Sequence, residues 1–176
     1  MATYKKGFKK TSGDLILLKT IVAIIVVVLA VVGIVFVYDV ATDKGDYADF
    51  TAIAAYDKIL TQTGTDSQQI PDYAVYFYNA DDQDCLDIQR KVLRLAEKME
   101  AKGLVIFFVD LDAVKETATG DQDDFLDAIQ KSSTFLNRSP MLVTVADGEF
   151  DAAYEGADAV VDTLTQIYNG EYTPFN

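Results

Sequence analysis

The chain has 176 residues, of which 28 are acidic and 15 are basic, so its net charge is −13 at pH 7. This charge excludes a nucleic-acid binder, because neutralising phosphates requires a basic surface. The chain has no histidine and a single cysteine. These counts exclude histidine zinc sites, Ser–His and Cys–His nucleophile pairs, and an intrachain disulfide.

The amino-terminal part of the chain predicts a membrane anchor. Residues 20–38 carry no charge, and about 20 apolar residues span the hydrocarbon core of a bilayer as a helix. Basic residues beside a first span stay in the cytoplasm, and lysines gather before this run, at Lys5, Lys6, Lys9, Lys10 and Lys19. We therefore expect a cytoplasmic basic tail (1–14), a transmembrane signal anchor (15–38), a linker (39–46) and an extracytoplasmic domain (47–176).

Two other interpretations fit an apolar run near the amino terminus. A cleaved signal peptide has an apolar core of about 7–15 residues, whereas this run is longer and the stretch 41–43 is a poor cleavage site. A buried core helix or strand is the second alternative. The uncharged length and the preceding lysines favour a single-pass protein of the cell membrane, with its amino terminus in the cytoplasm.

The first half of the exterior domain predicts a helix followed by a strand–helix–strand unit. Apolar residues at helical spacing predict a helix over residues 47–61. The continuous aromatic and β-branched run 73–78 predicts a buried strand. A long helix is predicted from the stripe of Cys85, Ile88, Val92, Leu95, Ala96 and Met99, ending at Gly103. Residues 104–109 predict a second strand, parallel to the first.

The second half predicts a helix, a hairpin and a final helix. An acidic stretch leads into a helix around Phe125, Ile129 and Leu136. A strand over 141–145 is followed by Asp147-Gly148, a strong hairpin signal, and an antiparallel return over 149–154. A last helix follows Gly156 and closes at Asn169-Gly170. The fold class is therefore α/β, with a central mixed sheet flanked by helices.

The residues around the first strand resemble a known family. The stretch 77–85 resembles the strand end and active-site loop of thioredoxin, and Ser139-Pro140 resembles the cis-proline segment of that family. The Asp147-Gly148 hairpin and the turn at Gly156 fit the same pattern, and the resemblance covers roughly residues 46–170. It implies a thioredoxin-like fold preceded by one transmembrane helix, and a cis peptide bond before Pro140.

The resemblance also implies a degenerate active site. The family's two catalytic cysteines fall on Asp82 and Cys85, and thiol–disulfide exchange needs both an attacking thiolate and a resolving thiol. Asp81 stands where the family usually has tryptophan, and Tyr76 where it has a buried acid. A dithiol oxidoreductase is therefore not expected, and no cofactor is implied.

Cys85 leaves two interpretations open. A helix amino terminus lowers a thiol pKa, which would suit a monothiol redox enzyme using Cys85 alone. Nearby carboxylates raise the pKa of a thiol by destabilising its thiolate, and four surround this position, from Asp81, Asp82, Asp84 and Asp87. Because Cys85 lies on the apolar stripe of its helix, we expect it to be a core residue.

The acidic clusters are not expected to bind a metal. Asn79, Asp81 and Gln83 alternate as in a calcium loop, but Asp84 stands at the glycine position and Arg90 at that of the bidentate glutamate. Carboxylates at a helix start are also expected from the macrodipole. A solvated acidic face is the expected role of the second cluster, Asp121, Asp123, Asp124 and Asp127.

These observations favour a membrane-anchored, non-catalytic protein-interaction module, an accessory subunit of a cell-envelope complex. Its partner would be another envelope or membrane protein. In the family that the sequence resembles, an extended peptide pairs beside the cis proline. The resemblance implies a binding groove here formed by Asp81, Asp82, Gln83, Asp84, Ser139 and Pro140. The alternatives are a monothiol enzyme using Cys85 and a structural subunit that associates through its span.

Overall fold

The computed structural model describes residues 12–42, 45–64 and 68–175. The chain divides into two units between residues 43 and 44, and each is described by itself. Most of the predicted tail (1–14) and part of the predicted linker (39–46) lie outside the described residues.

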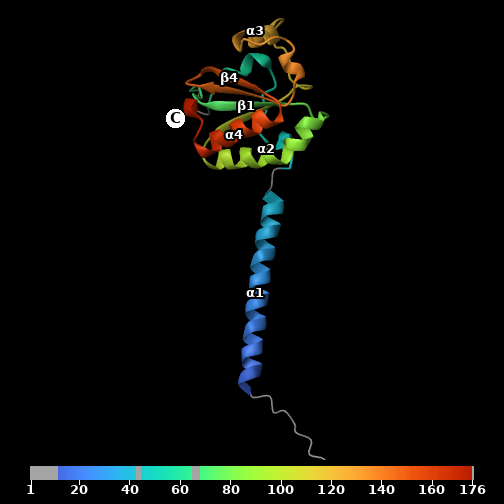
Figure 1. The fold of residues 1–176 in the computed structure, drawn as a ribbon, viewed down its shortest axis with the longest axis vertical. Coiled ribbons are helices and arrows are strands. Elements are labelled where there is room, and N and C mark those ends of the chain that lie inside the picture. Colours follow the sequence, from blue (N-terminus) through green and yellow to red (C-terminus); the bar gives the residue numbers. More distant parts are fainter. Residues whose placement is uncertain (1–11, 43–44, 65–67, 176) are drawn as a thin grey trace, which may run out of the picture. The chain divides into compact units, whose positions relative to one another are not determined.

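The first unit contains one long helix, α1 (Ser12–Thr42). Its stretch Leu17–Ile34 is long and apolar enough to cross a membrane, and none of that stretch is buried inside the protein. Figure 1 shows α1 as one continuous helix without a break. A helix with apolar side chains exposed all round satisfies its backbone internally and needs an apolar surrounding for its side chains.

The second unit is built on a four-stranded mixed sheet in the order β2-β1-β3-β4. β1 (Tyr73–Tyr78) pairs in parallel with β2 (Val105–Asp110) and antiparallel with β3 (Met141–Ala146), which pairs antiparallel with β4 (Glu149–Glu155). Both residues of the Asp147-Gly148 turn have a positive φ, as a tight hairpin of this type requires. The predicted strands and hairpin are confirmed.

Helices cover both faces of this sheet. α2 (Gln83–Ala101) and α4 (Ala157–Asn169) contact each other on one face, where β1 directs Ala74, Tyr76 and Tyr78. The other face carries α3 (Asp121–Ala128) and receives the alternate β1 side chains (Figure 1). All six β1 residues are buried, which explains why the strand reads as a continuous apolar run.

The helix predicted over residues 47–61 is wrong. The structure has only two 3-10 turns there, Tyr47–Asp49 and Tyr56–Lys58. Tyr47 and Phe50 pack into the core on the α2/α4 side, whereas Ile53 and Tyr56 pack into the core on the α3 side. The segment therefore passes from one face of the sheet to the other, which a helix presenting a single apolar stripe cannot do.

The helix predicted around Phe125, Ile129 and Leu136 is shorter than expected. α3 ends at Ala128, and a separate 3-10 turn spans Phe135–Asn137. Gln130 adopts a positive φ of 54°. The amides of Gln130 and Lys131 donate to the carbonyls of Asp127 and Leu126, the pattern of a Schellman C-cap. This cap ends the helix without the glycine that usually marks such an end.

Candidate functional site

The predicted site lies where the parallel strands β1 and β2 end. Tyr78 and Asp110 are partners in the strand register, so the loops that follow them start side by side. The Leu111 amide donates to the Tyr78 carbonyl at 2.9 Å and holds the two loops together. Ligands of open α/β sheets bind at the carboxyl ends of strands where neighbouring connections diverge. Here the connection after β1 leads into α2 and the one after β2 leads toward α3.

Asp82, which the sequence resemblance aligns with an attacking cysteine, is the N-cap of α2. Its carboxylate accepts a hydrogen bond from the Cys85 amide at 3.1 Å. Asn79 fixes the preceding turn, because its side-chain oxygen accepts from the Asp81 amide at 2.8 Å. An N-cap carboxylate satisfies an otherwise unpaired helix amide. An oxygen acceptor at position 82 therefore stabilises the start of α2.

Cys85 is buried, with a free thiol and no exposed surface. Burial raises the pKa of this thiol, and the charge of Asp82 adds to the rise. Hydrogen bonds of the thiol with the Asn79 backbone and with the side chains of Ser139 and Tyr76 act in the opposite direction but do not cancel it. The expectation that Cys85 faces the core is confirmed. Its thiol is therefore mostly protonated at neutral pH.

Two tyrosines form a buried hydroxyl pair beneath the start of α2. The Tyr47 hydroxyl donates to the Cys85 carbonyl at 3.0 Å. It lies 3.1 Å from the Tyr76 hydroxyl. Because Tyr47 uses its one proton on the carbonyl, Tyr76 is the donor in the tyrosine pair. Burial raises the pKa of Tyr76, the residue that the sequence resemblance aligns with a buried acid. It stays neutral and cannot act as a base at physiological pH.

Ser139 and Pro140 approach this loop from the start of β3. The Ser139–Pro140 peptide bond is cis, as predicted. Pro140 is buried, and its carbonyl accepts from the Gly156 amide at 2.9 Å. Among the described residues, no hydrogen bond engages the backbone amide or carbonyl of Ser139, which is half-buried. These two backbone groups remain available to another chain.

A groove of about 500 Å³ opens beside Ser139. It is lined by residues from five segments of the domain: Tyr56, Asn79, Asp82, Leu111, Asp112, Gln122, Ser133, Leu136, Asn137 and Ser139. Its volume lies within the range typical of small-molecule and peptide-side-chain pockets. Polar side chains outnumber apolar ones in this lining, and none is lysine or arginine. The groove can therefore accept hydrogen bonds and carries negative charge without an internal counter-ion.

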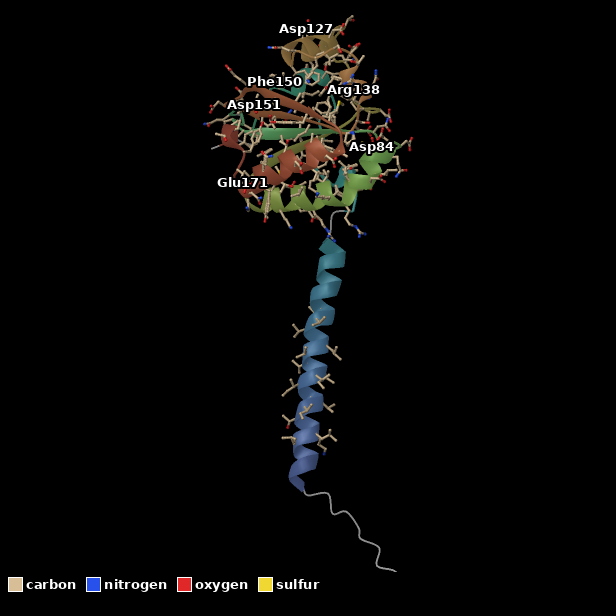
Figure 2. The ribbon with its side chains drawn as sticks, in the orientation of Figure 1. Asp84, Asp127, Arg138, Phe150, Asp151 and Glu171 are labelled. Atoms are coloured by element: carbon tan, nitrogen blue, oxygen red, sulfur yellow. The ribbon has the colours of Figure 1, made fainter. Side chains whose placement is uncertain are left out.

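The predicted binding residues divide into two groups. Asp82 and Ser139 line the groove, and Pro140 lies buried next to it. Asp81, Gln83 and Asp84 do not line it; they are exposed at the start of α2. Figure 2 shows Asp84 at the outer surface of the first turn of that helix. The Gln83 side chain donates to Asp87 at 2.6 Å, along the helix surface.

Several groove residues were missed by the sequence-based prediction. Asp112 could have been found, because it follows β2 at the same sheet edge at which Asn79 follows β1. Tyr56 carries no such signal, because it reaches the groove only through the crossing of the 47–61 segment between the two faces. In the described residues no group of three or more acidic or cysteine side chains is arranged to hold a metal ion.

Known proteins were compared with the chain. No protein-family model matches it, and no curated protein matches it. Among solved structures, mitochondrial thioredoxin 3 from Saccharomyces cerevisiae is 16% identical, covering 70% of this chain and 97% of its own, with a TM-score of 0.46. Thioredoxin O2 from Arabidopsis thaliana is 20% identical, covering 70% and 94%, with a TM-score of 0.45.

A third solved structure of the same kind is thioredoxin from Trypanosoma brucei brucei. It is 12% identical and covers 72% of this chain and 96% of its own, with a TM-score of 0.44. Three features of the domain identify its fold: the sheet order β2-β1-β3-β4, the parallel β1–α2–β2 unit, and the terminal hairpin followed by α4. The domain has a thioredoxin-like fold, preceded by one helix long and apolar enough to span a membrane.

Proposed function

We propose that this chain is a membrane-anchored, non-catalytic protein-interaction module of the cell envelope, with residues 47–176 outside the membrane and the amino terminus in the cytoplasm. Its role is that of an accessory subunit that holds another envelope or membrane protein. The observation that carries this proposal is the pair formed by Asp82 and Cys85. The first caps α2 with its carboxylate, and the second is buried with a raised pKa.

The unpaired backbone of Ser139 supports a binding role. An extended peptide can pair with exposed backbone groups, a recognition mode that uses main-chain hydrogen bonds for affinity and pockets for specificity. Ser139 offers an amide and a carbonyl beside a groove that can receive side chains. This arrangement needs no chemistry at Cys85.

A photo-cross-linking amino acid at position 137 of the full chain, in its native membrane, tests the binding role. Asn137 is exposed and lines the groove. We expect one defined cross-linked protein, identified by mass spectrometry and retained when Cys85→Ala is added. The same probe at position 162, on the exposed side of α4, serves as the control. Equal cross-linking from both positions would contradict a binding role for the groove.

The alternative function, a monothiol redox enzyme, has one observation in its favour. Ser139, which lines the groove, lowers the pKa of the Cys85 thiol through its side chain, so the buried thiol lies next to a groove residue. Thiol labelling separates the two functions. The binding module predicts slow reaction of native protein with a water-soluble disulfide reagent and fast reaction after denaturation. Fast labelling of the native chain, with loss of the cellular phenotype in a folded Cys85→Ala variant, would support the enzyme instead.

A further inference from the structure

The lining of the groove indicates which chemistry its occupant carries. Asp82 and Asp112 place two carboxylates on it, from the loops that follow β1 and β2. Of the basic side chains near it along the chain, Arg138 and Lys131 both pair with Glu155, at 2.7 and 3.4 Å, and Lys115 does not line the groove. The lining therefore carries negative charge and no cation to balance it.

Tyr56 gives a second, independent indication of a ligand. This side chain lines the groove although only 7% of its surface is exposed. Among the described residues its hydroxyl has no hydrogen-bond partner. No fully buried polar side-chain atom in the same part of the chain lacks one. The hydroxyl therefore keeps some exposed surface, and Tyr56 lines two cavities.

The neighbours of Tyr56 favour the groove as the side on which that hydroxyl is exposed. The second cavity, of about 180 Å³, contains Phe125, against whose ring Tyr56 packs at 6.0 Å. Burial raises the pKa of Tyr56, and the negative charge of Glu116 adds to the rise, so Glu116 lies near enough to act on the hydroxyl. Glu116 in turn accepts from the backbone amide of Gln122 at 3.4 Å, and Gln122 lines the groove but not the smaller cavity.

We propose that the groove binds an extended segment of a partner protein through a lysine or arginine side chain, whose cationic end lies against Asp82 and Asp112 beside the Tyr56 hydroxyl. This inference rests on the proposed function and names the partner's chemistry. The cation supplies the missing counter-charge, and its N–H groups can donate to both carboxylates and to the phenol oxygen. The volume of the groove exceeds that of one side chain, which leaves room for the partner's backbone beside Ser139.

The test uses the purified full chain in a non-ionic detergent and three labelled peptides of equal length. The basic probe is acetyl-Ser-Ala-Arg-Ala-Lys-Ala-Ser-amide. The neutral probe has citrulline and acetyl-lysine at the two charged positions, and the acidic probe has glutamate at both. Binding is followed by fluorescence anisotropy. A benzophenone on each peptide identifies the contact residues by mass spectrometry.

Three variants separate the groove from the general acidity of the chain. The double variant Asp82→Asn with Asp112→Asn removes both charges, while asparagine keeps the N-cap of α2. Tyr56→Phe removes only the hydroxyl and keeps the ring against Phe125. The matched control is Asp158→Asn with Asp162→Asn, two exposed acids on α4 that do not line the groove.

We expect the basic peptide to bind most tightly and to cross-link at groove residues. Its affinity should fall about tenfold or more in the Asp82/Asp112 variant, less in Tyr56→Phe, and less than about twofold in the control, where exposed charges contribute little. Binding should also weaken as salt rises, since added ions screen exposed charges.

Each other outcome overturns a defined part of this argument. Equal groove binding of neutral or acidic peptides would overturn the cationic preference and leave the proposed function standing. Basic binding that falls equally in the groove and control variants would show attraction to the whole acidic domain and also overturn the inference. If no peptide of any charge binds and position 137 cross-links no protein, the proposed function fails together with it.

Discussion

The Tyr47 hydroxyl donates a hydrogen bond to the backbone carbonyl of Cys85, 3.0 Å away, across 38 positions of sequence. This bond joins the 3-10 turn Tyr47–Asp49 to the first turn of α2. Tyr76 completes it by donating to Tyr47. The ring of Tyr47 also packs against Tyr78 at 4.3 Å between ring centroids. The start of the domain is thereby fixed to the same backbone that carries Asp82.

Replacing Tyr47 by phenylalanine should destabilise the domain. The change removes the hydrogen bonds from Tyr47 to the Cys85 carbonyl and from Tyr76 to Tyr47 in a buried setting, at a cost of about 1–3 kcal/mol. The free energy of unfolding of the full chain, followed by near-ultraviolet circular dichroism, measures this. Tyr168→Phe is the matched control, because Lys102 lies over that ring at 3.8 Å and the ring is kept. Equal stability of the two variants would show that the hydroxyl network contributes nothing.

The stability of the domain should depend on the hydrogen-bonding capacity of residue 82 more than on its charge. Asp82→Ala removes the acceptor of the Cys85 amide and should cost about 0.5–2 kcal/mol of unfolding free energy. Asp82→Asn should recover most of that loss, because asparagine caps helices as well as aspartate does. Thermal unfolding of the unaltered chain, Asp82→Ala and Asp82→Asn measures these differences in stability. If Asn is as harmful as Ala, the carboxylate acts through its charge on the helix dipole instead.

Stability should fall in alkaline solution. Burial raises the pKa of Tyr47 and of Tyr78 to about 12, and it also raises the pKa of Tyr76 and Cys85. Above about pH 10 the unfolded chain releases these protons while the folded chain keeps them, so unfolding becomes more favourable as pH rises. The stabilisation is complete below the unfolded pKa and is lost as pH rises through the folded one.

The pH dependence is measured as unfolding free energy from about pH 8 to about pH 12, alongside tyrosinate absorbance. In the folded chain some tyrosines should lose their protons at a higher pH than free tyrosine does. After denaturation they should titrate near the ordinary tyrosine pKa. Tyr47→Phe should lower the slope of stability against pH, because it removes one of the shifted groups. Identical titration of the folded and unfolded chains, with no loss of stability, would refute the shifts.

The orientation of the anchor should depend on the lysines before it. With the basic side chains intact, protease added to intact cells should digest residues 47–176, because positive charge is retained in the cytoplasm. Replacing Lys5, Lys6, Lys9 and Lys10 by glutamate should reduce or invert that exposure. Permeabilised cells provide the control for protease access. Protection of the domain in intact cells carrying the unaltered chain would reverse the proposed topology.

The strands and the long helices were predictable because their signals are local. A run such as 73–78 is buried on both faces, and Gly103 and Gly156 mark ends that need a positive φ. The crossing of the 47–61 segment was not predictable from spacing. Tyr47, Phe50, Ile53, Tyr56 and Ile59 recur at every third position, and helical periodicity does not distinguish one buried face from two. The cap at Gln130 was missed because glutamine rarely adopts that conformation.

Residues of the candidate site were predictable only where a local sequence motif contains them. Asp82 and Ser139 were found through motifs that resemble a family, while Tyr56 and Gln122 reach the groove from segments whose course the sequence misjudged. The burial of Cys85 followed from its place on the apolar stripe. Its hydrogen bond from Tyr47 depends on a contact between distant segments that no local pattern encodes.

The two outer strands of the sheet differ in how they could meet a second copy of the chain. The outer side of β2 is partly occupied, because Ala52 bridges Phe108 and the Ile53 amide donates to the Phe108 carbonyl at 2.8 Å. β4 has no such cover from a further strand in the described domain, but it carries the acidic side chains of Glu149 and Asp151, in addition to Glu155, which pairs with Arg138 and Lys131. Two copies aligned there would bring like charges together, which opposes edge-to-edge aggregation. This acidity therefore protects the open edge of the sheet against self-association.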